Sequence, residues 1–403
     1  MTQPFTLGVN YWPRRKAMYW WRDFDAGEVS DEFAIIRDSG LTTVRIFLLW
    51  DDWQPTPDTV SRECLDHLEK VCDAAADHGL GLDVTFFTGH MSGPNWSPGW
   101  LLNGQPPVPG ARPLISGGKI VNSGYRNYFV DDVALSAQRL LLETVVGRFH
   151  QHPGIWLWNL GNEPDLFAVA PDRATGANWV RSMTETIKAI DDRHPVTCGL
   201  HIASLLNSAP LRVDDAFAEV DLAVMHSYPM YSMPIARHPL DPDYVPFTCA
   251  LTTALCGKPT LMQEFGGCMV HPGAPSQTWA WRLMGKDRTQ FMASEEDMAE
   301  FIRQSLPRLV EVGALGAMVW CFADYSSELW TKPPCDQFWH ERFFGLVRPD
   351  GTVKPHADVM RAFADTQPTV QPARRTVALD VTPDEYYASP LNHFVRLYQD
   401  WIK

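Results

Sequence analysis

Residues 155–160 read IWLWNL, and Gly161-Asn162-Glu163-Pro164 and a helical pattern at 172–192 follow them. The run is apolar without alternation, which is typical of a strand buried on both faces of a parallel sheet. Seven further runs share this character, and a helical stretch follows each; they span 6–10, 43–48, 80–87, 195–200, 222–226, 260–264 and 317–322. Eight strand–helix units predict an α/β fold of the (β/α)8 TIM barrel type rather than an open doubly wound sheet.

The helical stretches alternate with these strands. They are expected at 29–39, 61–78, 129–150, 172–192, 291–312 and 354–365, with shorter ones near 208–218 and 244–256. No G-x-G-x-x-G or P-loop pattern follows a strand, which counts against a nucleotide-binding fold. We predict that residues 1–365 form the catalytic barrel and that residues 366–403 form a C-terminal extension packed on it.

Two connections are too long to be simple turns. Residues 89–118 follow the third strand and residues 267–290 follow the seventh, so both leave the carboxyl ends of strands, where barrel active sites are built. Long loops without structure of their own are usually functional. Their tryptophans have no obvious core to fill and are expected to wall off one end of a substrate cleft; they are Trp96, Trp100, Trp279 and Trp281.

The composition excludes several classes of protein. The charge sum of 34 − 48 gives −14, which argues against a nucleic-acid surface, and no run of 18 apolar residues could span a membrane. The N-terminus lacks a signal-peptide pattern, and the eight cysteines form no C-x-x-C pair. We therefore expect a cytoplasmic protein with reduced thiols. Sixteen tryptophans favour carbohydrate as the ligand, because indole rings stack on sugar faces.

Two glutamates follow or end strands of the predicted barrel. Glu163 lies just past the fourth strand, and Glu264 ends the seventh. Although 101 positions separate them, the parallel strands of a barrel bring both to the same rim. One isolated glutamate would more simply form an ion pair there, but a charge at the end of each of two apolar strands favours a pair of catalytic carboxylates.

With these motifs the sequence resembles glycoside hydrolase clan A, and within it family 5, the cellulases, mannanases and β-mannosidases. The resemblance runs from about Thr6 to Asp365 and rests on Asn162-Glu163-Pro164 together with Glu264. It implies that Glu163 is the acid/base and Glu264 the nucleophile. Further positions match the family's binding or supporting residues: Arg45, His90, Asn162, His226, Tyr228 and Trp320.

The chemistry of retaining hydrolysis fits this pair. One carboxylate attacks the sugar while the other protonates the leaving oxygen, and an arginine near the nucleophile favours its ionised form. From the residues alone, His226 could equally be a core histidine and Trp320 could equally pack the barrel. Asp324 and Glu328, after the eighth strand, either contact sugar hydroxyls or face water. A metal-dependent hydrolase would need histidine clusters at several strand ends, so we expect no metal and no cofactor.

We therefore predict a retaining β-glycosidase, most simply an exo-acting β-mannosidase on short β-mannosides and manno-oligosaccharides. The alternatives are an endo-β-1,4-mannanase or β-glucanase and, in another class, a carbohydrate-binding barrel without catalysis. The expected partner is an oligosaccharide or β-glycoside substrate, with neither nucleic acid nor membrane involved. The sequence leaves the sugar, its linkage and the oligomeric state open.

Overall fold

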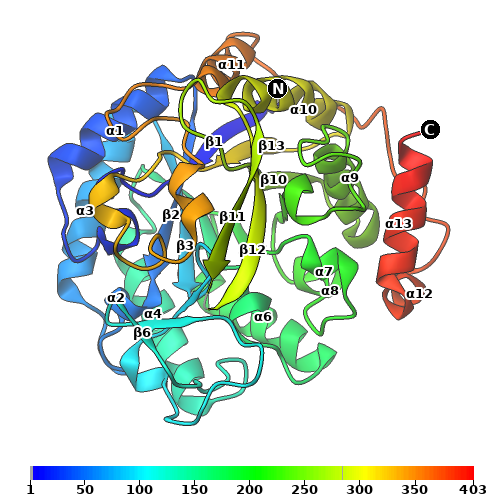
Figure 1. Ribbon diagram of the computed structural model, residues 1–403. Helices are drawn as coiled ribbons and strands as arrows, with labels where there is room; N and C mark the ends of the chain where they lie inside the picture. Colours follow the sequence, from blue (N-terminus) through cyan, green and yellow to red (C-terminus); the bar gives the residue numbers. More distant parts are fainter. Residues whose placement is uncertain (1–2, 284) are drawn as a thin grey trace.

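The structure, a computed structural model, describes residues 3–283 and 285–403. Eight parallel strands form its central sheet: β1 Thr6–Asn10, β2 Thr43–Leu49, β3 Gly81–Thr88, β7 Ile155–Asn162, β8 Val196–Gly199, β9 Ala223–Ser227, β10 Thr260–Gly266 and β13 Gly316–Trp320. The strand order is β8-β7-β3-β2-β1-β13-β10-β9. A parallel bridge between His201 and His226 joins the ends of this series, so the sheet closes (Figure 1). The predicted barrel is confirmed.

Helices surround the barrel close to the expected places. The long ones are α1 Ala26–Asp38, α3 Arg62–Asp77, α4 Asp132–Phe149, α6 Arg173–Lys188, α9 Tyr244–Cys256, α10 Glu295–Glu311 and α11 Pro355–Ala364. The short ones are α2 Trp50–Trp53, α5 Pro164–Phe167, α7 Ala203–Leu206 and α8 Val213–Ala218. The predicted start of α10 at residue 291 is wrong, because the Ser294 side chain caps the helix by accepting from the Asp297 N–H.

The two long connections contain strands, which corrects the expectation of structureless loops. The first holds β4 Asn95–Trp96, β5 Leu114–Ser116 and, just beyond it, β6 Lys119–Val121. The second forms an antiparallel hairpin of β11 Gln277–Leu283 and β12 Lys286–Met292. Figure 1 shows this hairpin lying across the face of the barrel. Both connections therefore build defined walls above the carboxyl ends of the strands.

The C-terminal segment carries α12 Pro383–Ala388 and α13 Pro390–Trp401, which lie outside α7 and α9 (Figure 1). The Tyr386 and Tyr387 hydroxyls donate to the backbone carbonyls of Leu205 and Ser204 in α7. The segment thereby fixes a short helix whose inner side borders the candidate site. The division of the chain at residue 365 remains a prediction.

Many of the tryptophans belong to the core. Seven tryptophans are less than 2% exposed: Trp12, Trp20, Trp21, Trp50, Trp53, Trp96 and Trp158. Large aromatic side chains bury much apolar area each, so they fill the space between barrel and helices. In the described part of the chain, no helix has the length and apolar character needed to cross a membrane.

Candidate active site

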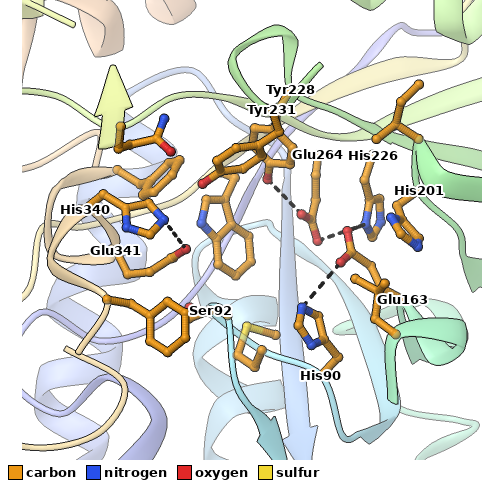
Figure 2. A pocket seen from close by; sticks show the side chains of 18 of the residues that line it. His90, Ser92, Glu163, His201, His226, Tyr228, Tyr231, Glu264, His340 and Glu341 are labelled. Atoms are coloured by element: carbon orange, nitrogen blue, oxygen red, sulfur yellow. Dashed lines mark hydrogen bonds and ion pairs between the residues drawn. The ribbon is translucent and has the colours of Figure 1, made fainter. Parts of the chain in front are cut away.

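Glu163 and Glu264 meet at the carboxyl end of the barrel, in a cavity of about 510 Å³ (Figure 2). Carboxylate oxygens of the two residues and a ring nitrogen of His226 all lie within 4.8 Å of one another. Glu163 has a left-handed backbone, with φ of 49°, where the chain turns from β7 into α5. Such a conformation is unfavourable for a residue with a side chain and is typically retained at functional sites.

Arg45, on β2, lies beneath the pair and is fully buried. Its Nη1 donates to Glu264 Oε1 at 2.5 Å, and its Nη2 donates to Asn162 Oδ1 at 3.0 Å. A buried guanidinium needs a carboxylate partner, and Glu264 supplies it. The same contact places the permanent positive charge of Arg45 beside the carboxylate of Glu264, the predicted nucleophile.

Tyr228 holds the other oxygen of Glu264. Its hydroxyl donates to Glu264 Oε2 at 2.8 Å. Burial and the nearby Glu264 charge raise the pKa of Tyr228 well above its usual value, so it stays a hydrogen-bond donor. Arg45 and Tyr228 together fix the orientation of the Glu264 carboxylate.

Gly199, at the end of β8, leaves room for this arrangement. A Cβ atom there would lie 2.5 Å from the Gly161 carbonyl oxygen and 2.9 Å from Arg45 Nη2. Both distances are shorter than van der Waals contact, so a side chain at this position would displace β7 or the arginine. The requirement for glycine here is steric, because the backbone and the guanidinium approach each other closely.

His226, on β9, contacts both Glu163 and Glu264. Its Nδ1 lies 3.0 Å from Glu163 Oε1 and 3.4 Å from Glu264 Oε1. Its Nε2 lies 3.1 Å from Gln263 Oε1, and Gln263 Nε2 donates to Asp83 Oδ2. Because Asp83 accepts from the amide nitrogen, the amide oxygen faces His226, and Nε2 must carry the hydrogen. Nδ1 is then the nitrogen that faces the two carboxylates.

The charges around Glu163 determine its protonation in the empty site. Burial opposes its ionisation, but the charge of His201 and the hydrogen bond and charge of His226 outweigh burial and lower the pKa of Glu163. The pKa of His201 is raised to about 9, since Asp165 and Glu163 outweigh the effect of burial. Burial, aided by Arg112, lowers the pKa of His90 to about 4. Glu163 is therefore a carboxylate, and the charged His201 and the neutral His90 are among its neighbours.

The remaining predicted residues also border the cavity. His90 Nε2 lies 3.8 Å from Glu163 Oε2, and Asn162 Nδ2 donates to the His90 carbonyl. Trp320, at the end of β13, lines the cavity. The structure thus brings together all eight residues singled out from the sequence, seven in the cavity wall and Arg45 beneath it. Their catalytic and binding roles remain predictions.

Most of the loop tryptophans lie away from the cavity that they were expected to wall. Of the four loop tryptophans, Trp281 lines the cavity, whereas Trp96 belongs to the core and Trp100 donates to the Gln54 carbonyl. Trp279 packs on Phe343 instead. Asp324 forms a buried ion pair with Lys354, with 2.7 Å between Nζ and Oδ2, and Glu328 faces solvent. Neither acidic residue borders the cavity.

Several cavity residues escaped the sequence analysis: Ser92, Arg112, His201, Tyr231, His340 and Glu341. His201 directly follows a predicted strand, so the strand-end rule could have found it. Glu341 lies in the loop after β13, where no pattern distinguishes it from other loop glutamates. Loop geometry alone brings it to the cavity.

Three side chains of the site, those of Glu163, His226 and Glu264, are of the kinds that bind metal ions. Within residues 3–283 and 285–403, Glu163, His226 and Glu264 are the one trio of metal-ligand side chains with such close donor atoms. The Arg45 guanidinium occupies Glu264 Oε1 and repels a cation there. The donor set fits proton transfer and nucleophilic attack better than metal binding.

A family model described as "Glycosyl hydrolases family 2, TIM barrel domain" matches residues 117–366, more than half of the chain. The chain belongs to this glycosyl hydrolase family. The expected resemblance to family 5 is confirmed at the level of the fold, because a GH5_18 structure from Streptomyces cattleya has a TM-score of 0.79 at 20% identity and covers 99% of this chain and 92% of that one.

Mannan endo-1,4-beta-mannosidase A of Hypocrea jecorina is 26% identical over 187 residues, which are 43% of this glycosyl hydrolase and 38% of the fungal protein. The chain thus spans well under two thirds of the length of this curated relative. A GH5_18 variant from Streptomyces cattleya in complex with Manβ1-4GlcNAc has a TM-score of 0.78 at 20% identity, covering 98% and 92% of the two chains. Exo-beta-1,4-mannosidase Op5Man5 from Opitutaceae bacterium strain TAV5 has a TM-score of 0.72 at 23% identity, covering 91% and 60%.

Proposed function

We propose that this glycosyl hydrolase is an exo-acting β-mannosidase that hydrolyses short β-mannosides with retention of configuration. The observation that carries the proposal is the pair Glu163 and Glu264 in a cavity that is walled on one side. Two of the similar structures support this sugar. One holds Manβ1-4GlcNAc, and the other is named an exo-beta-1,4-mannosidase. The curated relatives are endo-mannosidases, which keeps the endo-acting alternative as the second candidate.

Retention is supported by the spacing of the carboxylates. One oxygen of each carboxylate lies within 4.8 Å of an oxygen of the other, whereas the two carboxyl groups of an inverting enzyme lie about 6.5–9.5 Å apart to admit a water between them. In the first step Glu264 bonds to carbon 1 of the sugar while the bond to the leaving oxygen breaks. In the second step a water replaces Glu264 and gives its proton to Glu163.

The leaving oxygen must receive a proton in the first step. Glu163 is a carboxylate in the empty site, and His226 Nδ1 lies 3.0 Å from it. We propose that this pair holds one proton, which passes to the leaving oxygen through Glu163. Gln263 supports the exchange because it fixes the hydrogen on the opposite nitrogen, Nε2.

Exo-action is supported by the walls of the cavity. A Cβ on Gly93, in the loop after β3, would lie 2.5 Å from the Phe338 ring in the loop after β13, so these loops touch. Trp281 of the β11–β12 hairpin donates to the Gln337 carbonyl at 2.9 Å. Three loops therefore meet on one side, where an endo-acting enzyme would need an open cleft.

A substrate panel tests the proposal. Initial rates are measured with p-nitrophenyl β-mannoside, β-glucoside and β-galactoside and with Manβ1-4GlcNAc, with Glu264→Gln as the inactive control. We expect the β-mannosides to give the highest kcat/KM. A preference for the glucoside or galactoside, at rates that Glu264→Gln abolishes, would replace the sugar assignment while leaving the glycosidase assignment in place.

The place of action is proposed on separate grounds. All eight cysteines are free thiols, and seven of them are buried. Free thiols persist in reducing compartments, so we propose that the enzyme acts in the cytoplasm on imported oligosaccharides. The protein is expressed in the cytoplasm and its free thiols are counted to test the proposed location.

A further inference from the structure

The cavity continues past the carboxylate pair into a recess between the loops that follow β3 and β13. Figure 2 shows Ser92, His340 and Glu341 on one side of Glu264, with Glu163 and His201 on the other. Ser92 comes from the first loop and the other two from the second.

These side chains hold polar atoms that the protein leaves without partners. Glu341 is 8% exposed, and its one ion-pair contact among the described residues is His340 Nε2, at 3.3 Å. Ser92 Oγ and His340 Nδ1 are buried, and neither has a hydrogen-bond partner in the part of the chain that the structure describes. Buried polar groups normally find partners, and a buried carboxylate without an arginine or lysine is costly. A ligand that brings hydroxyl groups would satisfy all three residues.

The catalytic geometry says which part of a substrate enters this recess. Glu163 must contact the oxygen between the two sugar units, so the leaving group lies on the side of Glu163 and His201. The sugar whose carbon 1 is attacked then extends the other way, toward Glu341. Carbons 3 and 4 form the ring edge farthest from carbon 1, so their hydroxyls point into the recess.

We propose that Glu341, with Ser92 and His340, binds the hydroxyls on carbons 3 and 4 of the terminal sugar and so selects a non-reducing end. The inference rests on the proposed function, since it uses the assigned roles of Glu163 and Glu264. The Glu341 carboxylate accepts from two neighbouring hydroxyls, an arrangement suited to its two oxygens. The touching loops at Gly93 and Phe338 close the recess behind them, and a further sugar on carbon 4 would have no space.

The test compares two substrates and three proteins. The substrates are p-nitrophenyl β-mannoside and its 3,4-dideoxy analogue, which lacks the hydroxyls in question. The proteins are the wild type, Glu341→Gln, which keeps the shape of the side chain, and Glu328→Gln, which changes an exposed glutamate of the same loop. Melting temperatures establish that each variant is folded, and Ser92→Ala provides a second substitution in the recess.

On the full mannoside, we expect Glu341→Gln to lower kcat/KM by about 10- to 100-fold, as is typical for hydrogen bonds to a charged group. On the dideoxy analogue the same substitution should change kcat/KM by less than about threefold, because the interaction is already absent. Glu328→Gln should behave as the wild type on both substrates. An equal loss on both substrates, or no loss on either, would overturn the proposal.

This design separates the inference from the function on which it rests. If the wild type prefers another β-glycoside in the panel, the β-mannosidase assignment fails. The same comparison with the dideoxy form of that glycoside then still decides whether Glu341 binds the far edge of the sugar.

Discussion

His201 should make the stability of this glycosyl hydrolase depend on pH. Its Nε2 lies 3.1 Å from Asp165 Oδ1, and the two side chains are 7% and 10% exposed. The folded-state pKa of about 9 stands above the usual histidine value of about 6.5. A histidine whose pKa is higher in the folded than in the unfolded state stabilises the folded state. This contribution to the free energy of unfolding is fully present below about pH 6.5 and is lost as the pH rises through about 9.

The size of the effect follows from the shift. The difference of about 2.5 pH units, at 1.36 kcal/mol each, corresponds to about 3 kcal/mol of unfolding free energy. The matched variant is His201→Gln, which removes the titrating group and leaves Asp165 without its charged partner. It should be less stable than the wild type at pH 6 by a similar amount.

Urea unfolding at pH values from 6 to 10 measures the effect. The wild type should lose about 3 kcal/mol over this range relative to His201→Gln, so that the two stabilities converge at high pH. The two proteins differ in this side chain alone, so the difference between their stabilities reports His201 together with the carboxylates that its charge stabilises. Parallel curves, with a constant difference at all pH values, would refute the assignment of a charged His201.

Three further predictions concern the nucleophile and its support. Glu264→Ala should lower turnover by at least about 10⁴-fold, and azide should restore it while forming an α-mannosyl azide, since azide attacks from the vacated face; a β-azide would make Glu163 the nucleophile. Arg45→Met should lower kcat by about 10- to 150-fold, the cost of a lost charged hydrogen bond, while circular dichroism remains native; near-normal turnover would make Arg45 structural. Gly199→Ala should cost about 1–3 kcal/mol of stability and also lower kcat, whereas Gly147→Ala, which has open space around it, should do neither; equal effects would exclude the steric argument.

The barrel can be predicted well from the sequence because its strands are buried on both faces and therefore consist of continuous apolar runs. The run at 155–160 becomes β7 starting at its first residue, and the run at 6–10 becomes β1 with identical bounds. Glu163 and Glu264 are found for a related reason, since each is a charge where an apolar strand ends. The position of a parallel strand then determines which side chains meet.

The walls of the cavity are less predictable. The segment at 277–292 forms a two-stranded hairpin with mostly exposed residues, so burial leaves little pattern in its sequence. The roles of Trp96 and Trp100 depend on how the loops fold back onto the core, and loop conformation is specified by contacts far along the chain. Glu341 is the extreme case, because it lies in the long loop after β13 and no strand end marks its position.

One experiment tests the central claim, that this enzyme removes single mannose units with retention. Mannohexaose is digested in deuterated buffer, and chromatography and proton NMR follow the first products. Retaining exo-action predicts steady release of mannose alone, formed first as the β-anomer. Early mannobiose and mannotriose would show an open cleft, and mannose formed first as the α-anomer would contradict the double displacement by Glu264 and Glu163.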